Sequence, residues 1–252
     1  MVLTRRIRRI RDTPRRRWLQ PTAVVAATVI VLASNCSGHF GSPIPEGIPP
    51  PPGDPVPDID ISARGRPADQ LAAWATPRAA ALGLPVTALE AYAYAAKVAQ
   101  VVNPRCHIGW TTLAGIGTVE SRNGTYRGAR IAPNGDVVPP IRGVKLDGTN
   151  GNLRIIEDAG TDGSEYAQAM GPMQFIPETW RLYGVDAHND GVVNVDNIDD
   201  AALAAAGYLC YRGHDLAKPI GWMDAILAYN NSGLYLRTVR DWATAYAAGH
   251  AL

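Results

Sequence analysis

The sequence predicts a mainly α-helical domain that follows an export segment and a proline-rich linker. Three observations lead to this fold class. Helical spacing of apolar residues begins near residue 69 and recurs to the end of the chain. Strict alternation of apolar and polar residues, which is typical of strands, is rare. The 252 residues, 46% of them hydrophobic, suffice for one domain with appendages and exclude a wholly disordered chain.

The charges are distributed unevenly along the chain. Eight arginines lie within the first 17 residues, where only Asp12 opposes them. The rest of the chain holds 16 of the 24 basic residues and 22 of the 23 acidic ones, so its net charge is −6. A mildly acidic body argues against nucleic-acid binding, which requires a basic face.

The first 36 residues have the features of an export signal. The uncharged stretch 23–33 follows the arginines and is about half as long as the ~20 residues that cross a bilayer. We therefore expect residues 1–36 to be a signal peptide or membrane anchor, and the protein to be exported to the cell envelope, either held at the membrane by this segment or secreted to the wall. Cleavage after Ala33, lipidation of Cys36 and retention as an anchor all remain open.

The domain itself is expected to span residues 69–252. Residues 37–68 are rich in proline and are expected to link it to the export segment, as a semi-rigid polyproline spacer or as an unstructured tail. Two cysteines, Cys106 and Cys210, lie inside the domain. An exported chain enters an oxidising compartment, so we predict that they form a disulfide worth ~4–5 kcal/mol by the chain-entropy argument. Two buried free thiols are the alternative.

The expected helices follow from apolar spacing and from residues that start or stop a helix. Asp69–Leu82 is rich in Ala and Leu, and Pro77 either interrupts it or starts a turn. The next helix opens at a capping box formed by Thr87 and Glu90 and ends near Val102. Further helices are expected at Trp110–Ser121, Pro177–Leu182, Ile198–Tyr211, Gly221–Tyr229 and Leu234–Ala247.

A long region without sustained periodicity, residues 126–168, separates the third helix from the fourth. It is rich in Gly, Asp and Pro, and short strands are expected near Ile131–Val138 and Leu153–Ile156. A loop this long inside a compact domain usually serves a function.

The candidate acid is Glu120, which ends an apolar helix in the run Gly115-Ile-Gly-Thr-Val-Glu120-Ser121. Apolar surroundings raise the pKa of a carboxyl group because desolvation disfavours the anion. A general acid that works near neutral pH needs such a shift. Taken alone this signal is weak, since a Glu near a helix end is most often solvated.

Three further stretches carry polar residues without an evident role in a core. Met170-Gly-Pro-Met173-Gln174-Phe-Ile-Pro-Glu-Thr-Trp180 contains a tight turn before Gln174. Asp199–Cys210 is a helix of small residues. Ala228-Tyr229-Asn230-Asn231-Ser232 ends a helix in a pair of amides.

The order and spacing of these motifs resemble those of the lytic murein transglycosylases. The closest branch is the membrane-bound B-type enzymes and their actinobacterial relatives, and the resemblance covers roughly residues 87–247. It implies a lysozyme-like fold that acts on peptidoglycan glycan strands, with Glu120 as the sole catalytic acid and base. It also implies substrate-binding roles for five residues: Ser121, Met173, Gln174, Tyr229 and Asn230.

The implied reaction needs one carboxyl group and no cofactor. It cleaves the β-1,4 bond between N-acetylmuramic acid and N-acetylglucosamine and leaves 1,6-anhydro ends without consuming water. A muramidase that hydrolyses the same bond is an alternative. Second carboxylates for it stand in the long loop, although solvated loop acids are commoner: Glu157, Asp158, Asp162 and Glu165. A non-catalytic glycan-binding module is a further alternative, but it would not need an acid with a raised pKa.

Residues 186–197 have the spacing of a calcium loop, and some B-type transglycosylases carry a similar EF-hand-like loop. Gly191 stands at position 6 of the pattern. Two positions depart from it. His188, at position 3, is a poor ligand for a hard cation, and Asn197 replaces the bidentate acid at position 12. A calcium site and a loop that keeps its shape without calcium both remain open. The side chains that would coordinate calcium are those at positions 1, 5 and 9: Asp186, Asp190 and Asn194.

Overall fold

The computed structural model describes residues 44–149, 154–156 and 166–252. Residues 1–36, which are predicted to be an export segment and include Cys36, lie outside the described residues. So do the four loop acids Glu157, Asp158, Asp162 and Glu165. Within the described residues, no helix is both long enough and apolar enough to cross a bilayer.

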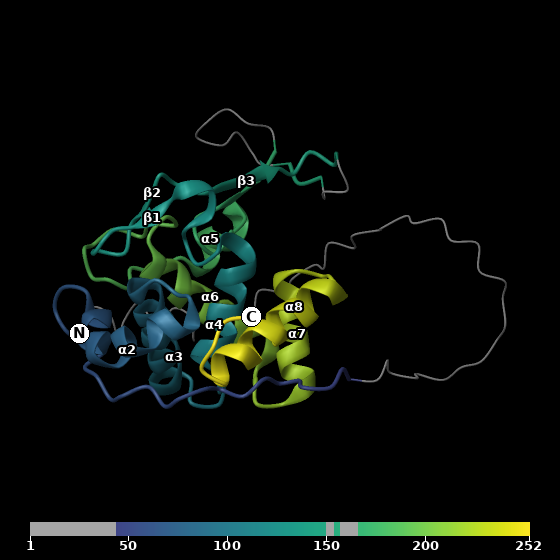
Figure 1. The fold of residues 1–252 in the computed structure, drawn as a ribbon. Coiled ribbons are helices and arrows are strands. Elements are labelled where there is room, and N and C mark those ends of the chain that lie inside the picture. The colour runs from purple at the N-terminus through teal and green to yellow at the C-terminus, as the bar shows by residue number, and fades with distance from the viewer. Residues whose placement is uncertain (1–43, 150–153, 157–165) are drawn as a thin grey trace.

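The described part of the chain is mainly α-helical, as predicted (Figure 1). The helix at residues 110–121 has the predicted bounds, and the others differ from prediction by a few residues at their ends, where helix assignments are least certain. A 3₁₀ helix, η1 (Pro67–Leu71), precedes the first α-helix. The α-helices are α2 (Ala72–Leu82), α3 (Val86–Val102), α4 (Trp110–Ser121), α5 (Pro177–Tyr183), α6 (Ile198–Gly213), α7 (Pro219–Tyr229) and α8 (Gly233–Ala247).

Small residues allow the helices to approach closely. α3 packs against α6, and α4 packs against α8. At Gly115 of α4, an added Cβ would lie 2.9 Å from the carbonyl oxygen of Val239 in α8, so only glycine permits this contact. At Gly117 the added Cβ would collide with the hydroxyl of Tyr92 from α3. The core around these crossings therefore fixes α4, which ends at Glu120 and Ser121.

Two small antiparallel strand pairs lie at one end of the helices (Figure 1). β1 (Arg130–Ile131) pairs with β2 (Val137–Val138), which confirms the strands expected in this stretch. β3 (Arg142–Lys145) pairs with β4 (Gln168–Met170), and this pair was not predicted. In the stretch expected to form a second strand, the described residues 154 and 156 make isolated bridges only.

The predicted disulfide is present. Cys106, in the turn before α4, is bonded to Cys210 in α6, 104 residues later. Both sulfurs are buried among apolar residues. The bond ties the start of α4 to the end of α6.

Two details of the predicted helices are wrong. Thr87 and Glu90 form no capping box, because the N-cap of α3 is Pro85, two residues earlier than predicted and without a side-chain hydrogen bond. Glu90 instead forms a buried ion pair with Arg66, whose charge attracts the carboxylate more strongly than a backbone N–H would. Pro77 neither interrupts the helix nor starts a turn, since α2 continues through it.

The described part of the proline-rich linker does not stand away from the domain. Residues 44–66, here called the strap, run along the helical body (Figure 1). Proline-rich backbone has no internal hydrogen bonds, so its carbonyl groups accept bonds from side chains of the body. The donors are Tyr94 to Ile61, Trp110 to Asp54, Thr111 to Pro51 and Arg240 to Glu46.

Candidate active site

The chain reverses direction immediately after Glu120. Arg122, Asn123 and Gly124 all have positive φ, and the backbone N–H groups of Arg122 and Asn123 bond back to the last turn of α4. Successive left-handed residues are costly outside glycine, so the surrounding structure must hold them. The reversal leaves Glu120 at the very end of the helix.

A buried hydrogen-bond network holds this reversal in place. Asn123 accepts from the Tyr92 hydroxyl at 3.0 Å and donates to the Thr118 hydroxyl at 3.0 Å. The Thr118 hydroxyl also lies 2.7 Å from that of Tyr246 in α8. Side chains of α3, α4 and α8 are thereby joined around Asn123, which belongs to the turn after Glu120. Such a connected network favours a single, rigid arrangement.

The side chain of Glu120 is half-buried. Within the described part of the chain it forms no salt bridge with a basic side chain. The Tyr235 hydroxyl donates a hydrogen bond of 2.6 Å to its Oε1. Burial raises the pKa of Glu120 to about 7, and the bond from Tyr235 opposes part of that rise. The sequence predicted this raised pKa from the apolar helix. A carboxyl group that is half protonated near neutral pH can donate a proton and later accept one.

Tyr235 is the functional residue that the sequence analysis missed. It lies in the first turn of α8, where the Ser232 side chain caps the helix by accepting from the backbone N–H of Tyr235. One signal could have found it. The apolar face of α8 contains Tyr235, Val239 and Tyr246 at helical spacing, and this face packs on α4, which carries Glu120.

The turn at residues 171–174 is attached to the end of α4 by Ser121. The Ser121 hydroxyl donates to the carbonyl oxygen of Pro172 at 2.6 Å and accepts from the backbone N–H of Gly124. Its side chain is buried, so it positions the turn and presents nothing to a substrate. The substrate-binding role expected of Ser121 stays a prediction, and in the structure its side chain joins the two segments.

Gln174 lies at the exposed end of this turn. Its backbone has a φ of 49°, and its side-chain amide donates to the carbonyl oxygen of Gly171 at 2.8 Å. Its Oε1 faces Gly143 in β3, where a Cβ would lie only 2.9 Å away. The side chain is half-buried, so a polar ligand can still reach it. The structure thus keeps Gln174 available for the role expected of it.

Met173 and Tyr229 support the same turn from inside. The Met173 side chain is fully enclosed by protein in the structure, and its expected role in binding substrate stays a prediction. Its carbonyl oxygen accepts a bond of 2.7 Å from the Tyr229 hydroxyl. The Tyr229 ring packs edge-on against Phe175 and Tyr208. Burial and the nearby charge of Glu120 raise the pKa of Tyr229, which places the two residues in one electrostatic environment.

Asn230 follows Tyr229 at the end of α7. Its side chain is exposed. The backbone carbonyl of Asn230 accepts from Ser232, and this turn leads into α8 and Tyr235. The exposed position suits contact with a ligand. Among the described residues, no hydrogen bond joins the side chains of Asn230 and Glu120.

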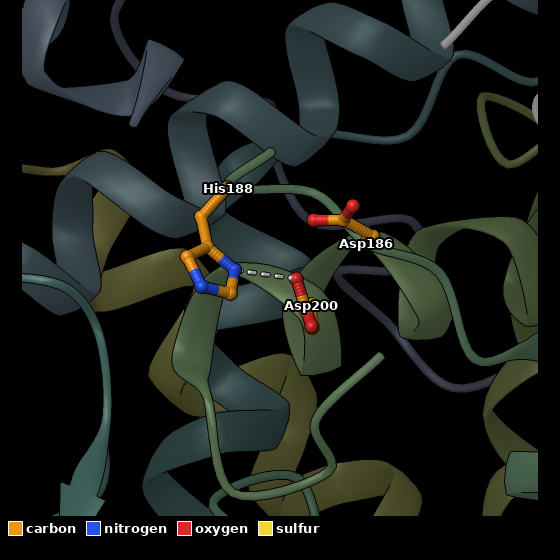
Figure 2. Close-up of side chains that lie close together, drawn as sticks. All are labelled: Asp186, His188 and Asp200. Atoms are coloured by element: carbon orange, nitrogen blue, oxygen red, sulfur yellow. Dashed lines mark hydrogen bonds and ion pairs between the residues drawn. The ribbon is translucent and has the colours of Figure 1, made fainter. Parts of the chain in front are cut away.

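The candidate calcium loop does not fit calcium. Asp186, His188 and Asp200 offer ligand atoms within 4.8 Å of one another (Figure 2). However, His188 bonds to Asp200 through Nδ1 at 3.0 Å and to Asp190 through Nε2 at 2.9 Å. Both ring nitrogens are therefore occupied. One of them, Nε2, binds the carboxylate of Asp190, which is one of the expected calcium ligands.

The remaining expected ligands are also engaged. Asp186 Oδ2 accepts from the backbone N–H of Gly191 at 3.0 Å. The Asn194 side-chain oxygen accepts from the backbone N–H of Asp196, and its amide donates to Asp136. Asn197, at position 12, caps α6 by accepting from the N–H groups of Asp199 and Asp200. The donor set that calcium prefers is not available here.

Comparison with known proteins adds one finding. Residues 152–223 match the family model of the transglycosylase SLT domain. The matched stretch contains the 171–174 turn, the 186–197 loop and α6, whereas Glu120 and Tyr235 lie outside it. The match supports a place in the lysozyme-like superfamily of lytic transglycosylases and activity on peptidoglycan glycan strands. No significant match is found among curated proteins or among solved structures.

Proposed function

We propose that this chain is a peptidoglycan lytic transglycosylase of the B-type branch, with Glu120 as its single acid and base. The observation that carries the proposal is the half-buried Glu120, with its raised pKa, at a helix end that Ser121 joins to the 171–174 turn. The family match places the same turn within a transglycosylase domain. No cofactor takes part in the proposed reaction.

In the first step Glu120 acts as the acid. Its carboxyl proton passes to the oxygen of the glycosidic bond, and the bond between that oxygen and C1 of N-acetylmuramic acid breaks. The N-acetylglucosamine part leaves with the proton as a hydroxyl. The acetamido group of the substrate stabilises the positive charge at C1. Burial of Glu120 favours this step because it keeps a fraction of the carboxyl protonated near neutral pH.

In the second step the Glu120 carboxylate acts as the base. It takes the proton of the C6 hydroxyl, whose oxygen bonds to C1 and closes the 1,6-anhydro ring. Tyr235 assists here, because its hydroxyl donates to the carboxylate and so stabilises the ion that the first step creates. The carboxyl group ends as it began, protonated, and no water enters.

Gln174 and Asn230 are proposed to bind the glycan. Both keep polar groups accessible, and both belong to segments that the Tyr229 hydroxyl links at the Met173 carbonyl. Met173, Ser121 and Tyr229 are proposed to position these segments. The export features of residues 1–36 support a location in the cell envelope, where peptidoglycan lies, with the membrane contacted through that segment.

The deciding experiment is a digest of purified peptidoglycan by the full chain, with the products read by mass spectrometry. We expect muropeptides lighter by one water than the hydrated products of a hydrolase. Glu120→Gln, which keeps the size and the hydrogen-bonding shape, should lower the rate by about 10²–10⁴-fold. Glu178→Gln, at an exposed position in α5, is the matched control and should leave the products unchanged.

Other products would point to other functions. Hydrated muropeptides that disappear in Glu120→Gln would identify a muramidase, and Asp162 and Glu165 would then be the second carboxylates to test. Binding of glycan strands without any cleavage would identify a non-catalytic module.

A further inference from the structure

The loop at residues 186–197 has the residue spacing of a calcium loop but binds an anion. The Asp200 carboxylate, fully buried at the start of α6, lies against the loop. The Asp200 Oδ1 accepts from the backbone N–H of Ala187, and its Oδ2 accepts from that of Asn194. A loop that binds a hard cation presents oxygen atoms to its centre. Here two backbone N–H groups of the loop point at a carboxylate instead.

The positive charge that balances Asp200 comes from His188. Its Nδ1 lies 3.0 Å from Asp200 Oδ1, and its Nε2 lies 2.9 Å from Asp190 Oδ2 (Figure 2 shows the first of these contacts). An ionised carboxylate only accepts hydrogen bonds, so both ring nitrogens must carry protons. The side chain is buried, so its charge is poorly screened.

We propose that the His188 imidazolium replaces the metal ion in this loop, so that the loop closes through the His188–Asp200 pair and needs no calcium. The side chain occupies position 3, where a calcium loop has an oxygen ligand. Its two ring nitrogens join Asp190, a residue of the loop, to Asp200, which follows the loop in the sequence. The cation is thus part of the chain.

The closed loop supports the 171–174 turn and both strand pairs. A Cβ at Gly171 would collide with the carbonyl oxygen of Val195, so the loop backbone lies directly against the turn. Asp196 accepts from the backbone N–H of Val137 in β2, and its carboxylate binds Arg142 of β3 through two bonds of 2.5 and 2.7 Å. Closure by His188 therefore fixes the surroundings of Gln174 without a metal.

The test is thermal unfolding of the full chain in calcium chloride and in the chelator EGTA, which does not depend on any enzymatic activity. We expect the Tm of the wild-type protein to be the same in both, within about 1 °C. His188→Gln removes the charge and should lower Tm by several degrees in both solutions. His250→Gln, at an exposed position near the C-terminus, is the matched control and should leave Tm unchanged.

A third variant asks whether a cation can return. His188→Asp restores an oxygen ligand at position 3 but leaves the loop with several carboxylates and no internal cation. Its Tm should fall in EGTA and recover by several degrees in calcium chloride, while calorimetric titration with calcium should show binding that the wild type lacks. A rise in the wild-type Tm on adding calcium chloride would overturn the proposal. So would a His188→Gln variant as stable as the wild type, a result that remains informative even if His188→Asp does not fold.

Discussion

The molecule surrounds its buried carboxyl groups in two different ways. At the end of α4, Glu120 accepts a hydrogen bond from the Tyr235 hydroxyl, and burial raises its pKa to about 7. Beneath the strap, Asp199 and Glu90 share one guanidinium. Arg66 binds Asp199 through two bonds of 2.7 and 3.0 Å and Glu90 through one. Burial also raises the pKa of Asp199, but the charge of Arg66 opposes this rise and limits it to about 6. The first carboxyl group is left ready to exchange a proton, and the other two are bound in ion pairs.

This difference shows how surroundings divide residues of one chemical type into reactive and structural roles. A buried acid without a cation changes its protonation state near neutral pH. A buried acid with a well-placed guanidinium becomes part of the framework. Arg66 also bonds to the carbonyl of Thr87, so every side of its head group is engaged. Burial alone would lower the pKa of Arg66, but Asp199, Glu90 and Asp69 together raise it well above its usual range.

Removing Arg66 should have the largest effect on stability. Arg66→Met keeps the length of the side chain but leaves Asp199 and Glu90 buried without a cation, and we expect the free energy of unfolding to fall by about 3–5 kcal/mol. Urea denaturation would measure it. The control is Arg78→Met, which breaks the exposed ion pair between α2 and Asp54 of the strap and should cost no more than about 1 kcal/mol. Equal losses in the two variants would show that burial of the pair does not matter.

Removing the charge of Glu120 should have the opposite effect and stabilise the folded protein. Its pKa is 4.5 when solvated and about 7 in the folded protein, so the folded state binds more protons between these pH values. Its contribution to stability is thus present at low pH and is lost as pH rises through 7. Glu120→Gln should match the wild type below pH 4.5 and exceed its stability by about 1–3 kcal/mol above pH 7. Denaturation across this pH range would check it. A wild-type protein as stable as Glu120→Gln at high pH would contradict the raised pKa.

Tyr235→Phe should sharpen the comparison with a smaller effect. The variant removes the hydrogen bond that the Tyr235 hydroxyl donates to Glu120, so the pKa of Glu120 should rise further. The alkaline limb of the pH–rate profile on peptidoglycan should then move up by about 1 unit or less. Tyr208→Phe loses a hydrogen bond to the carbonyl of Ala228 and serves as control, with its limb unmoved. If both profiles coincide with that of the wild type, Tyr235 does not act on the acid.

Much of the helical fold could be predicted because its signals are local. α4 was predicted with its exact ends, since an apolar run stops at Asn123 and Gly124. The strap could not be placed in this way. Proline composition predicts extended backbone, but the side chains that bind it, such as Tyr94 and Trp110, belong to helices packed by tertiary contacts. The pairing of β3 with β4 was missed for the same reason, because its partners lie more than 20 residues apart.

The candidate site divides along the same line. Glu120 could be singled out as a candidate because its apolar neighbours adjoin it in the sequence, and its role came from the resemblance to the transglycosylases. Tyr235 could not be found in this way, since it reaches Glu120 from 115 residues away through the packing of α8 on α4. The sequence also did not show that Ser121 and Met173 are buried, because a motif locates a residue without saying which way its side chain points.

The strap also sets the order in which the fold can be completed. Glu46 bonds to Arg240, 194 residues later, and Arg66 bonds to Asp199, 133 residues later. Synthesis proceeds from the N-terminus, so the strap is made before α6 and α8, which carry Asp199 and Arg240. Its bonds to these two residues cannot form until α6 and α8 exist. Such contacts between distant parts of the chain slow folding, and here they make closure of the strap a late event that follows assembly of the helices.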